Sequence, residues 1–183
     1  MKLWHKTAIG VGITAVVATV GISTIIKPVQ PQPVVTTRIS AAEIYPHPET
    51  IGFTNPDVTQ ANISQNICNP SWSTKSIRPP SNYTAALKVK QLANGYALNE
   101  DTNTADYEED HLISLELGGN PTDERNLWPE PYTTSISDGG AKIKDTVENY
   151  LHKQVCNGSI TLAQAQTEIS TDWYRVLKMQ MGK

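Results

Sequence analysis

The segment 107–131, YEEDHLISLELGGNPTDERNLWPEP, limits what this chain can fold into more than any other part of the sequence. His111 ends a short strand, the pair Gly118-Gly119 reverses the chain, and Asn126 lies on the returning strand. A glycine turn between two short apolar runs is typical of a β-hairpin. A helix-forming stretch with further acidic residues follows, so the sequence predicts a small α+β domain with more helix than strand.

The N-terminal region, residues 1–26, is not domain-like. Thr7–Ile26 is a 20-residue run without a charge, and a helix of that length spans a bilayer core of roughly 30 Å. A cleaved signal peptide is the alternative, although its apolar region usually has only about 7–15 residues. We expect an uncleaved membrane anchor that keeps Lys2 and Lys6 inside. The rest of the chain is then exported, either anchored and facing the periplasmic or extracellular side, or secreted if the N-terminal helix is cleaved.

Residues 27–37 predict a stiff proline-rich linker, and residues 38–183 the folded domain. Beyond the linker, 12 basic residues stand against 18 acidic ones, which is a formal charge of −6. Because nonspecific DNA-binding proteins usually have a basic surface, this charge argues weakly against a nucleic-acid partner. Six of the acidic residues lie between Glu100 and Asp110, where we expect a loop leading into the hairpin. A local basic rim remains available from Lys75, Arg78, Lys88 and Lys90.

Cys68 and Cys156 are the two cysteines of the chain. Two thiols are too few for a four-cysteine zinc site. In an oxidising compartment a Cys68–Cys156 disulfide is expected, and two free buried thiols are the alternative.

Three helices are expected around the hairpin. The first covers 84–93, with Thr84 as its cap and Gly95 after its end. Pro129 and Pro131 are expected to break regular structure after the hairpin, before a helix over 141–156. The caps expected for that helix are Ser137 or Asp138 at its start and Asn157-Gly158 at its end.

The last helix is expected from the capping box of Thr161 and Gln164 to about Lys178. Its inward face comprises Leu162, Ala165, Ile169, Trp173 and Val176. On the helix over 141–156, an apolar stripe contains Ile143, Val147, Tyr150, Leu151 and Val155, and the neighbouring face carries Asp145, Glu148 and His152. We expect Lys144 to face water. Trp72, Trp128 and Trp173 could stack on bases, but packing in the core is the expected role.

The hairpin residues suit the hydrolysis of a phosphodiester, which needs a base for water and a cation to stabilise the developing charge. His111 is the expected general base, because imidazole is partly neutral near pH 7. Asp110 and a helix carboxylate, Asp145 or Glu148, supply the oxygen ligands that Mg²⁺ prefers. Asn126 is expected to hold the histidine strand in place. Adjacent strand residues point to opposite faces, so Asp110 and His111 share a site only if the strand ends or bulges there.

DHLISLELGG followed by ERNLWPEP resembles the HNH (His-Me finger) endonuclease superfamily, and most closely its exported bacterial and phage-encoded branch. The similarity extends through ICNPSWSTKSIRP and KDTVENYLHKQVCNG and covers most of residues 52–175. The resemblance implies a ββα-metal core in which His111 is the general base, Asp110 the first metal ligand and Asn126 the structural asparagine.

The chain departs from the family at the third signature residue, usually a His or Asn in the first turns of the helix. Here the helix offers Asp145, Glu148, Asn149 and His152. Asp145 and Glu148 lie nearer its start and are preferred as metal ligands, because His152 lies about two turns further along.

These observations predict a metal-dependent endonuclease that acts outside the cytoplasm on DNA in preference to RNA. The expected cofactor is a divalent cation, with Mg²⁺ first and Mn²⁺ or Zn²⁺ as alternatives, and no small-molecule cofactor is expected. The partners are nucleic acid and, through the N-terminal helix, the membrane. One alternative is a catalytically silent, membrane-anchored envelope protein that uses the same fold as a binding module. A second is a structural domain stabilised by a metal.

Overall fold

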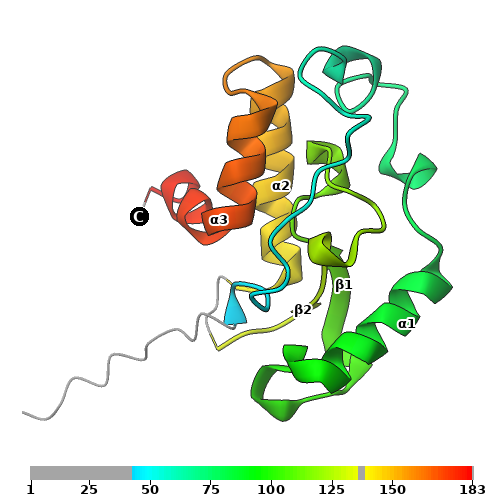
Figure 1. Ribbon diagram of the computed structural model, residues 1–183. Helices are drawn as coiled ribbons and strands as arrows, with labels where there is room; N and C mark the ends of the chain where they lie inside the picture. The colour runs from blue at the N-terminus through cyan, green and yellow to red at the C-terminus, as the bar shows by residue number, and fades with distance from the viewer. Residues whose placement is uncertain (1–42, 136–138, 183) are drawn as a thin grey trace, which may run out of the picture. The chain divides into compact units, whose positions relative to one another are not determined.

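The computed structural model describes residues 43–135 and 139–182. In these ranges the chain forms an α+β domain (Figure 1). Its main elements are α1 (Ser81–Gln91), β1 (Tyr107–His111), β2 (Leu127–Pro131), α2 (Ala141–Cys156) and α3 (Leu162–Gln180). The small α+β class is therefore confirmed. The expected anchor at 1–26, the linker at 27–37 and the expected helix caps Ser137 and Asp138 lie outside the described residues.

Helices α2 and α3 run side by side and enclose most of the apolar core (Figure 1). The bounds of α2 are those that the sequence predicts, although its N-cap residue is Gly140 and not a side-chain cap. The capping box of Thr161 and Gln164 begins α3 as expected. All five residues expected on the inward face of α3 are buried, whereas Tyr150 of the expected α2 stripe is 40% exposed.

A disulfide joins Cys68 to Cys156, as the sequence predicts. It connects the irregular segment before α1 to the last residue of α2. Because 88 residues separate the two cysteines, the bond closes a loop that contains the whole hairpin.

The hairpin itself differs from the expectation in two ways. Most of β1 lies in the acidic stretch expected to be a loop, since Tyr107 to His111 pair in antiparallel register with Pro131 to Leu127. The prolines of β2 also lie within the strand and do not break it. The carbonyl of Asn126 and the N–H of Tyr132 point toward β1. Because backbone groups alternate in direction along a strand, the nitrogens of Pro129 and Pro131 point to the outer edge, where the lack of an N–H breaks no bond to β1.

Helix α1 begins three residues before the expected start, after Pro80. Thr84 lies inside it and bonds back to the carbonyl of Ser81. The turn Leu92–Tyr96 follows, where Gly95 takes a φ of 95° that suits glycine. From the end of α1, the Gln91 side chain donates to the carbonyl of Leu127 on the outer edge of β2 at 2.8 Å.

The hairpin lies between α1 and α2 (Figure 1). Alternation places Glu108, Asp110, Trp128 and Glu130 on one face of the sheet. This face meets α2, because Lys144 of that helix bonds Asp110. The other face, with Tyr107 and Glu109, is directed toward α1. Residues from two helices thus converge on the end of β1.

Candidate functional site

His111 is the last residue of β1 and is only 4% exposed. Its Nε2 lies 3.0 Å from the carbonyl oxygen of Pro121. A carbonyl only accepts hydrogen bonds, so Nε2 carries the hydrogen and Nδ1 of the neutral ring keeps the lone pair. Burial lowers the pKa of His111 below its ordinary value. The ring is therefore neutral at pH 7 and has one nitrogen that can accept a proton.

Asp110 and His111 line the same pocket, of about 170 Å³, although they are neighbours in a strand. The strand ends at His111, whose pairing with Leu127 is the last of the ladder, so strict alternation no longer separates the two side chains. Asp145 and Glu148 of α2 line this pocket as well. The expected base and the three expected metal ligands thus line one pocket, but in the described part of the chain the group of three possible ligand side chains with atoms within 4.8 Å of one another is Cys68, His152 and Cys156. The structure does not bring His152 to the pocket of Asp110, because that residue lines a different pocket, next to the disulfide.

Asn126 is completely buried directly before β2. Its Oδ1 accepts from the backbone N–H groups of Phe53 at 3.2 Å and Ile113 at 2.9 Å. Its Nδ2 donates to the carbonyls of Ile113 and Asn120, each at 3.0 Å. A Cβ on Gly119 would lie 1.7 Å from the Ile113 carbonyl oxygen, so only glycine fits in this loop. Asn126 therefore ties together three segments around His111 and has no capacity left for a substrate.

Lys144 does not face water as expected, because it is 0% exposed. Its ammonium donates to Asp110 Oδ2 at 2.6 Å, to the carbonyl of His111 at 2.9 Å and to Glu148 Oε1. Glu130 Oε2 lies 3.7 Å away. The hairpin closes over this side chain of α2, and only that tertiary contact buries it. Lys144 thus joins α2 to the end of β1 through a network of charged groups.

The protonation states in this network follow from burial and from Lys144. Burial alone raises the pKa of Asp110, but the charge and the hydrogen bond of Lys144 bring it below the ordinary value. Burial raises the pKa of Glu130 well above its usual range, and burial raises the pKa of Glu148 to about 8. Lys144 stays charged, because three carboxyl groups raise its pKa. At pH 7 the main ion pair is therefore Lys144 with Asp110.

The pocket is rich in oxygen atoms of the kind that bind divalent cations. Five carboxyl groups line it, from Glu108, Asp110, Glu116, Asp145 and Glu148. Lys144 bonds one oxygen each of Asp110 and Glu148, which leaves the second oxygen of each carboxylate. Within the described part of the chain, the buried Glu116 Oε1 and Ser114 Oγ have no hydrogen-bond partner. Oxygen donors in excess of their partners are the donor set of a hard cation such as Mg²⁺ or Mn²⁺.

Arg78 also belongs to the site, although the sequence indicated it only as one of four residues that could form a basic rim. It lines the pocket of Asp110 and His111 and also a second hollow that reaches toward α1. Glu108 and His111 line both hollows too. The guanidinium has no hydrogen bond or ion pair among the residues that the structure describes. Arg78 comes from the loop before α1, so its approach to His111 has no local sequence signal.

Cys68, His152 and Cys156 form a second group of metal-ligand types, with one ligand atom of each within 4.8 Å of the others. The two cysteines are joined by the disulfide, so their sulfurs are not the thiolates that bind metals. His152 Nε2 lies 2.7 Å from the carbonyl of Ile67, which is its hydrogen-bond acceptor. This group supplies three ligands only when the disulfide is reduced.

Comparison of the chain with models of protein families, with curated proteins and with solved structures finds no match. The HNH resemblance therefore stays a prediction from the motif. Among the described helices, none combines the length and the apolar character that a membrane span requires. The N-terminal run predicted as an anchor is outside that part of the chain.

Proposed function

We propose that this domain is a metal-dependent endonuclease of the HNH type, which hydrolyses phosphodiester bonds of DNA in preference to RNA. The observation that carries the proposal is the pocket at the end of β1. There a neutral, oriented histidine adjoins five carboxyl groups and Arg78, whose guanidinium has no hydrogen bond or ion pair with the described residues. Hydrolysis of a phosphodiester requires three parts: an oriented base, ligands for a hard cation and a group that binds the phosphate anion.

In the proposed reaction, Nδ1 of His111 takes a proton from the water that attacks phosphorus. The bond from Nε2–H to the Pro121 carbonyl keeps the ring in the tautomer that this step needs. Asn126 keeps the loop that carries Pro121 against the end of β1, since it bonds both Ile113 and Asn120. The lowered pKa of His111 keeps the base unprotonated at neutral pH.

Asp110, Asp145 and Glu148 would hold the divalent cation, which stabilises charge on the phosphate and on the departing oxygen. Lys144 keeps Asp110 ionised and fixes its orientation from behind. Arg78 borders His111 on the side of the second hollow and binds a phosphate oxygen there, as a guanidinium does well.

The proposal is tested with the full chain on supercoiled plasmid and on RNA, each with Mg²⁺, Mn²⁺ or EDTA. His111→Ala should lower cleavage by about 10²–10⁴-fold in a protein that stays folded, with some loss of melting temperature because the ring is buried and hydrogen-bonded, and added imidazole should restore part of the activity. Arg78→Ala should also slow cleavage, whereas the matched control Arg175→Ala, an exposed arginine of α3, should not. Absence of cleavage by the folded, metal-supplied wild-type protein would contradict the proposal.

A second candidate function is a binding module without catalysis. Lys144 favours it, because this ammonium already bonds two of the three carboxylates expected to bind the metal. This alternative predicts that nucleic acid or another polymer binds equally well in the presence of EDTA and of the cation, and that it is never cut. Binding that requires the cation, followed by turnover, would exclude it.

A further inference from the structure

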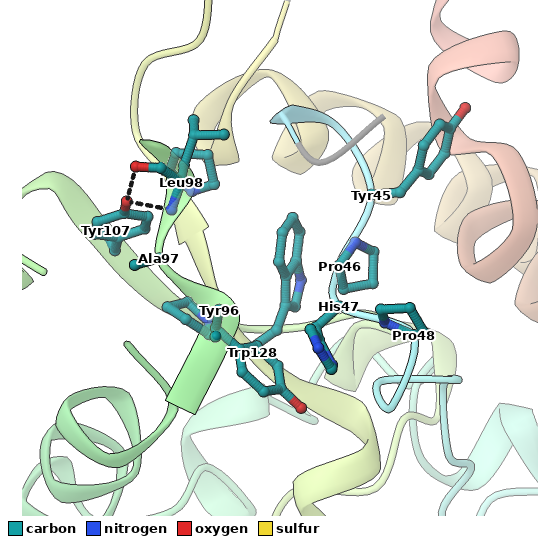
Figure 2. A pocket seen from close by; sticks show the side chains of 12 residues that line it. Tyr45, Pro46, His47, Pro48, Tyr96, Ala97, Leu98, Tyr107 and Trp128 are labelled. Carbon is teal, nitrogen blue, oxygen red and sulfur yellow. Dashed lines mark hydrogen bonds between the residues drawn. The ribbon is translucent and has the colours of Figure 1, made fainter. Parts of the chain in front are cut away.

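A cavity of about 310 Å³ lies beside the hairpin, away from the pocket of Asp110 (Figure 2). Residues 45–48 form one wall and residues 95–98 another, while Tyr107, Trp128 and the two prolines of β2 form the floor. No lysine, arginine, aspartate or glutamate lines it. Its volume is at the lower end for small-ligand sites, which run from about 300 Å³. The cavity therefore suits a small, uncharged and largely apolar group.

Flat rings dominate the walls. The rings of His47 and Tyr96 lie with their centroids 4.5 Å apart and their planes tilted by 30°. Figure 2 shows the Trp128 indole beside Pro46, with the rings of His47 and Tyr96 below it in this view. Rings this close already stack on each other, so a further flat ring can stack only on an outer face of the pair, as aromatic side chains do when they hold unpaired nucleobases. The bound group is thus expected to be planar.

Trp128 is 3% exposed, and its Nε1–H has no hydrogen-bond partner among the described residues. The two tyrosine hydroxyls nearby are already used: the half-buried Tyr45 donates to Asp172 at 2.5 Å, and the buried Tyr107 donates to the carbonyl of Asp101 at 2.9 Å. A buried indole N–H usually finds an acceptor. The donor left over at this cavity calls for a ligand that carries an acceptor at the edge of its ring.

We propose that this cavity binds one unpaired nucleobase, stacked on the aromatic side chains and accepting a hydrogen bond from Trp128. The inference rests on the proposed function for its role, which is to hold a single-stranded substrate. Tyr107 at the cavity and His111 at the candidate site are the two ends of β1, four residues or about 13 Å apart. A single strand that follows the hairpin can therefore place a base in the cavity and a phosphate at His111. A base held in a duplex cannot enter, because its edge is paired and its faces are stacked.

The test separates the cavity from the chemistry. Adenosine and thymidine, which contain no phosphodiester, are titrated into the full chain by calorimetry. Trp128→Phe keeps a ring but removes the donor, and should weaken binding by roughly five- to tenfold. Tyr96→Ala, a half-buried position, should weaken it as well without the risk of unfolding. The matched controls are Trp72→Phe, near the disulfide, and Tyr150→Ala, exposed on α2, and neither should change the affinity.

Nucleoside binding that falls in Trp128→Phe or Tyr96→Ala and persists in both controls supports the inference, whether or not plasmid is cut. Preference of the wild-type enzyme for single-stranded DNA, reduced in Tyr96→Ala, supports the role of the cavity in substrate choice. Absence of nucleoside binding overturns the inference even if His111-dependent cleavage is observed, and the proposed function then stands alone. Binding of a polyproline peptide in place of the nucleosides overturns it too, because aromatic surfaces also hold that helix.

Discussion

Replacement of Lys144 by methionine is the sharpest test of how the candidate site is held together. The side chain is completely buried and gives its three hydrogens to Asp110, Glu148 and the carbonyl of His111. Methionine has a similar length but no charge and no donor. The substitution therefore leaves Asp110 as a buried carboxylate without its main partner and leaves one backbone carbonyl unbonded.

The expected loss can be estimated from these three bonds. One bond to the Asp110 carboxylate at about 1.5–3 kcal/mol, and two bonds to the neutral Glu148 carboxyl and the His111 carbonyl at about 1 kcal/mol each, give a gross loss of about 3.5–5 kcal/mol. The variant no longer has to desolvate an ammonium, which returns part of this, so a net loss of about 2–4 kcal/mol in the free energy of unfolding is expected at pH 7. For a chain of this size that corresponds to a fall in melting temperature on the order of 10 °C.

The loss should depend on pH with a definite sign. Lys144 helps to lower the pKa of Asp110 below its ordinary value, so the wild-type protein has this stabilisation at neutral pH and loses it as the pH falls through the folded-state pKa. The gap between wild type and Lys144→Met should therefore narrow toward pH 3. Urea denaturation at pH 7 and pH 3 measures it, with Lys142→Met, an exposed lysine of the same helix, as the matched control. A loss at pH 7 no larger than that of the control, or an equal loss at both pH values, would refute this reasoning.

Three further perturbations have expected outcomes. Asn126→Ala removes four buried hydrogen bonds and should cost about 3–4 kcal/mol in urea denaturation; a loss below 1 kcal/mol would mean that the loop is held by other contacts. Burial raises the pKa of Glu109 to about 8, so the wild-type protein should lose stability as the pH rises from about 4.5 to 8. Glu109→Gln should then be more stable than wild type at pH 9, on the order of 5 kcal/mol, and nearly equal at pH 5, and parallel stability–pH curves for the two proteins would argue against it. Reduction of the Cys68–Cys156 disulfide, which spans 88 residues, should lower stability by about 4 kcal/mol, and an unchanged midpoint in dithiothreitol would show that the bond does not constrain the unfolded chain.

The helices and the disulfide could be predicted from the sequence. The helix signals lie within a few neighbouring residues, and two cysteines allow a single pairing. The Thr161–Gln164 box and the spacing of apolar residues specify α3 within a few neighbouring positions. With two cysteines in the chain, only one intramolecular pairing was available. β1 was mistaken for a loop because its residues are mostly acidic, and strand formation there depends on pairing with β2, some 20 residues later in the chain.

The hairpin part of the candidate site could be predicted from the sequence directly, and Asp145 and Glu148 of α2, which line the same pocket, were expected from the resemblance. Asp110, His111 and Asn126 belong to the hairpin segment, so its pattern indicates them directly. The roles of Lys144 and Arg78 depend on how α2 and the loop before α1 pack against the end of β1, which no local spacing encodes. A lysine beside an apolar stripe is usually a solvated flank, and the tertiary fold reverses that expectation here.

The acidic character of the domain need not oppose a phosphate substrate, because formal charge overstates the negative charge in the pocket. Burial raises the pKa of Glu108, Glu116 and Asp145, and raises that of Glu148 to about 8. Part of this carboxyl set is thus protonated near neutral pH when no cation is bound. A divalent cation that binds the set releases those protons and makes the local field attractive to a phosphate, so cation and substrate are expected to bind in that order. Under the proposed function, the same carboxyl groups that make the sequence look unsuited to nucleic acid would make its recognition conditional on a metal.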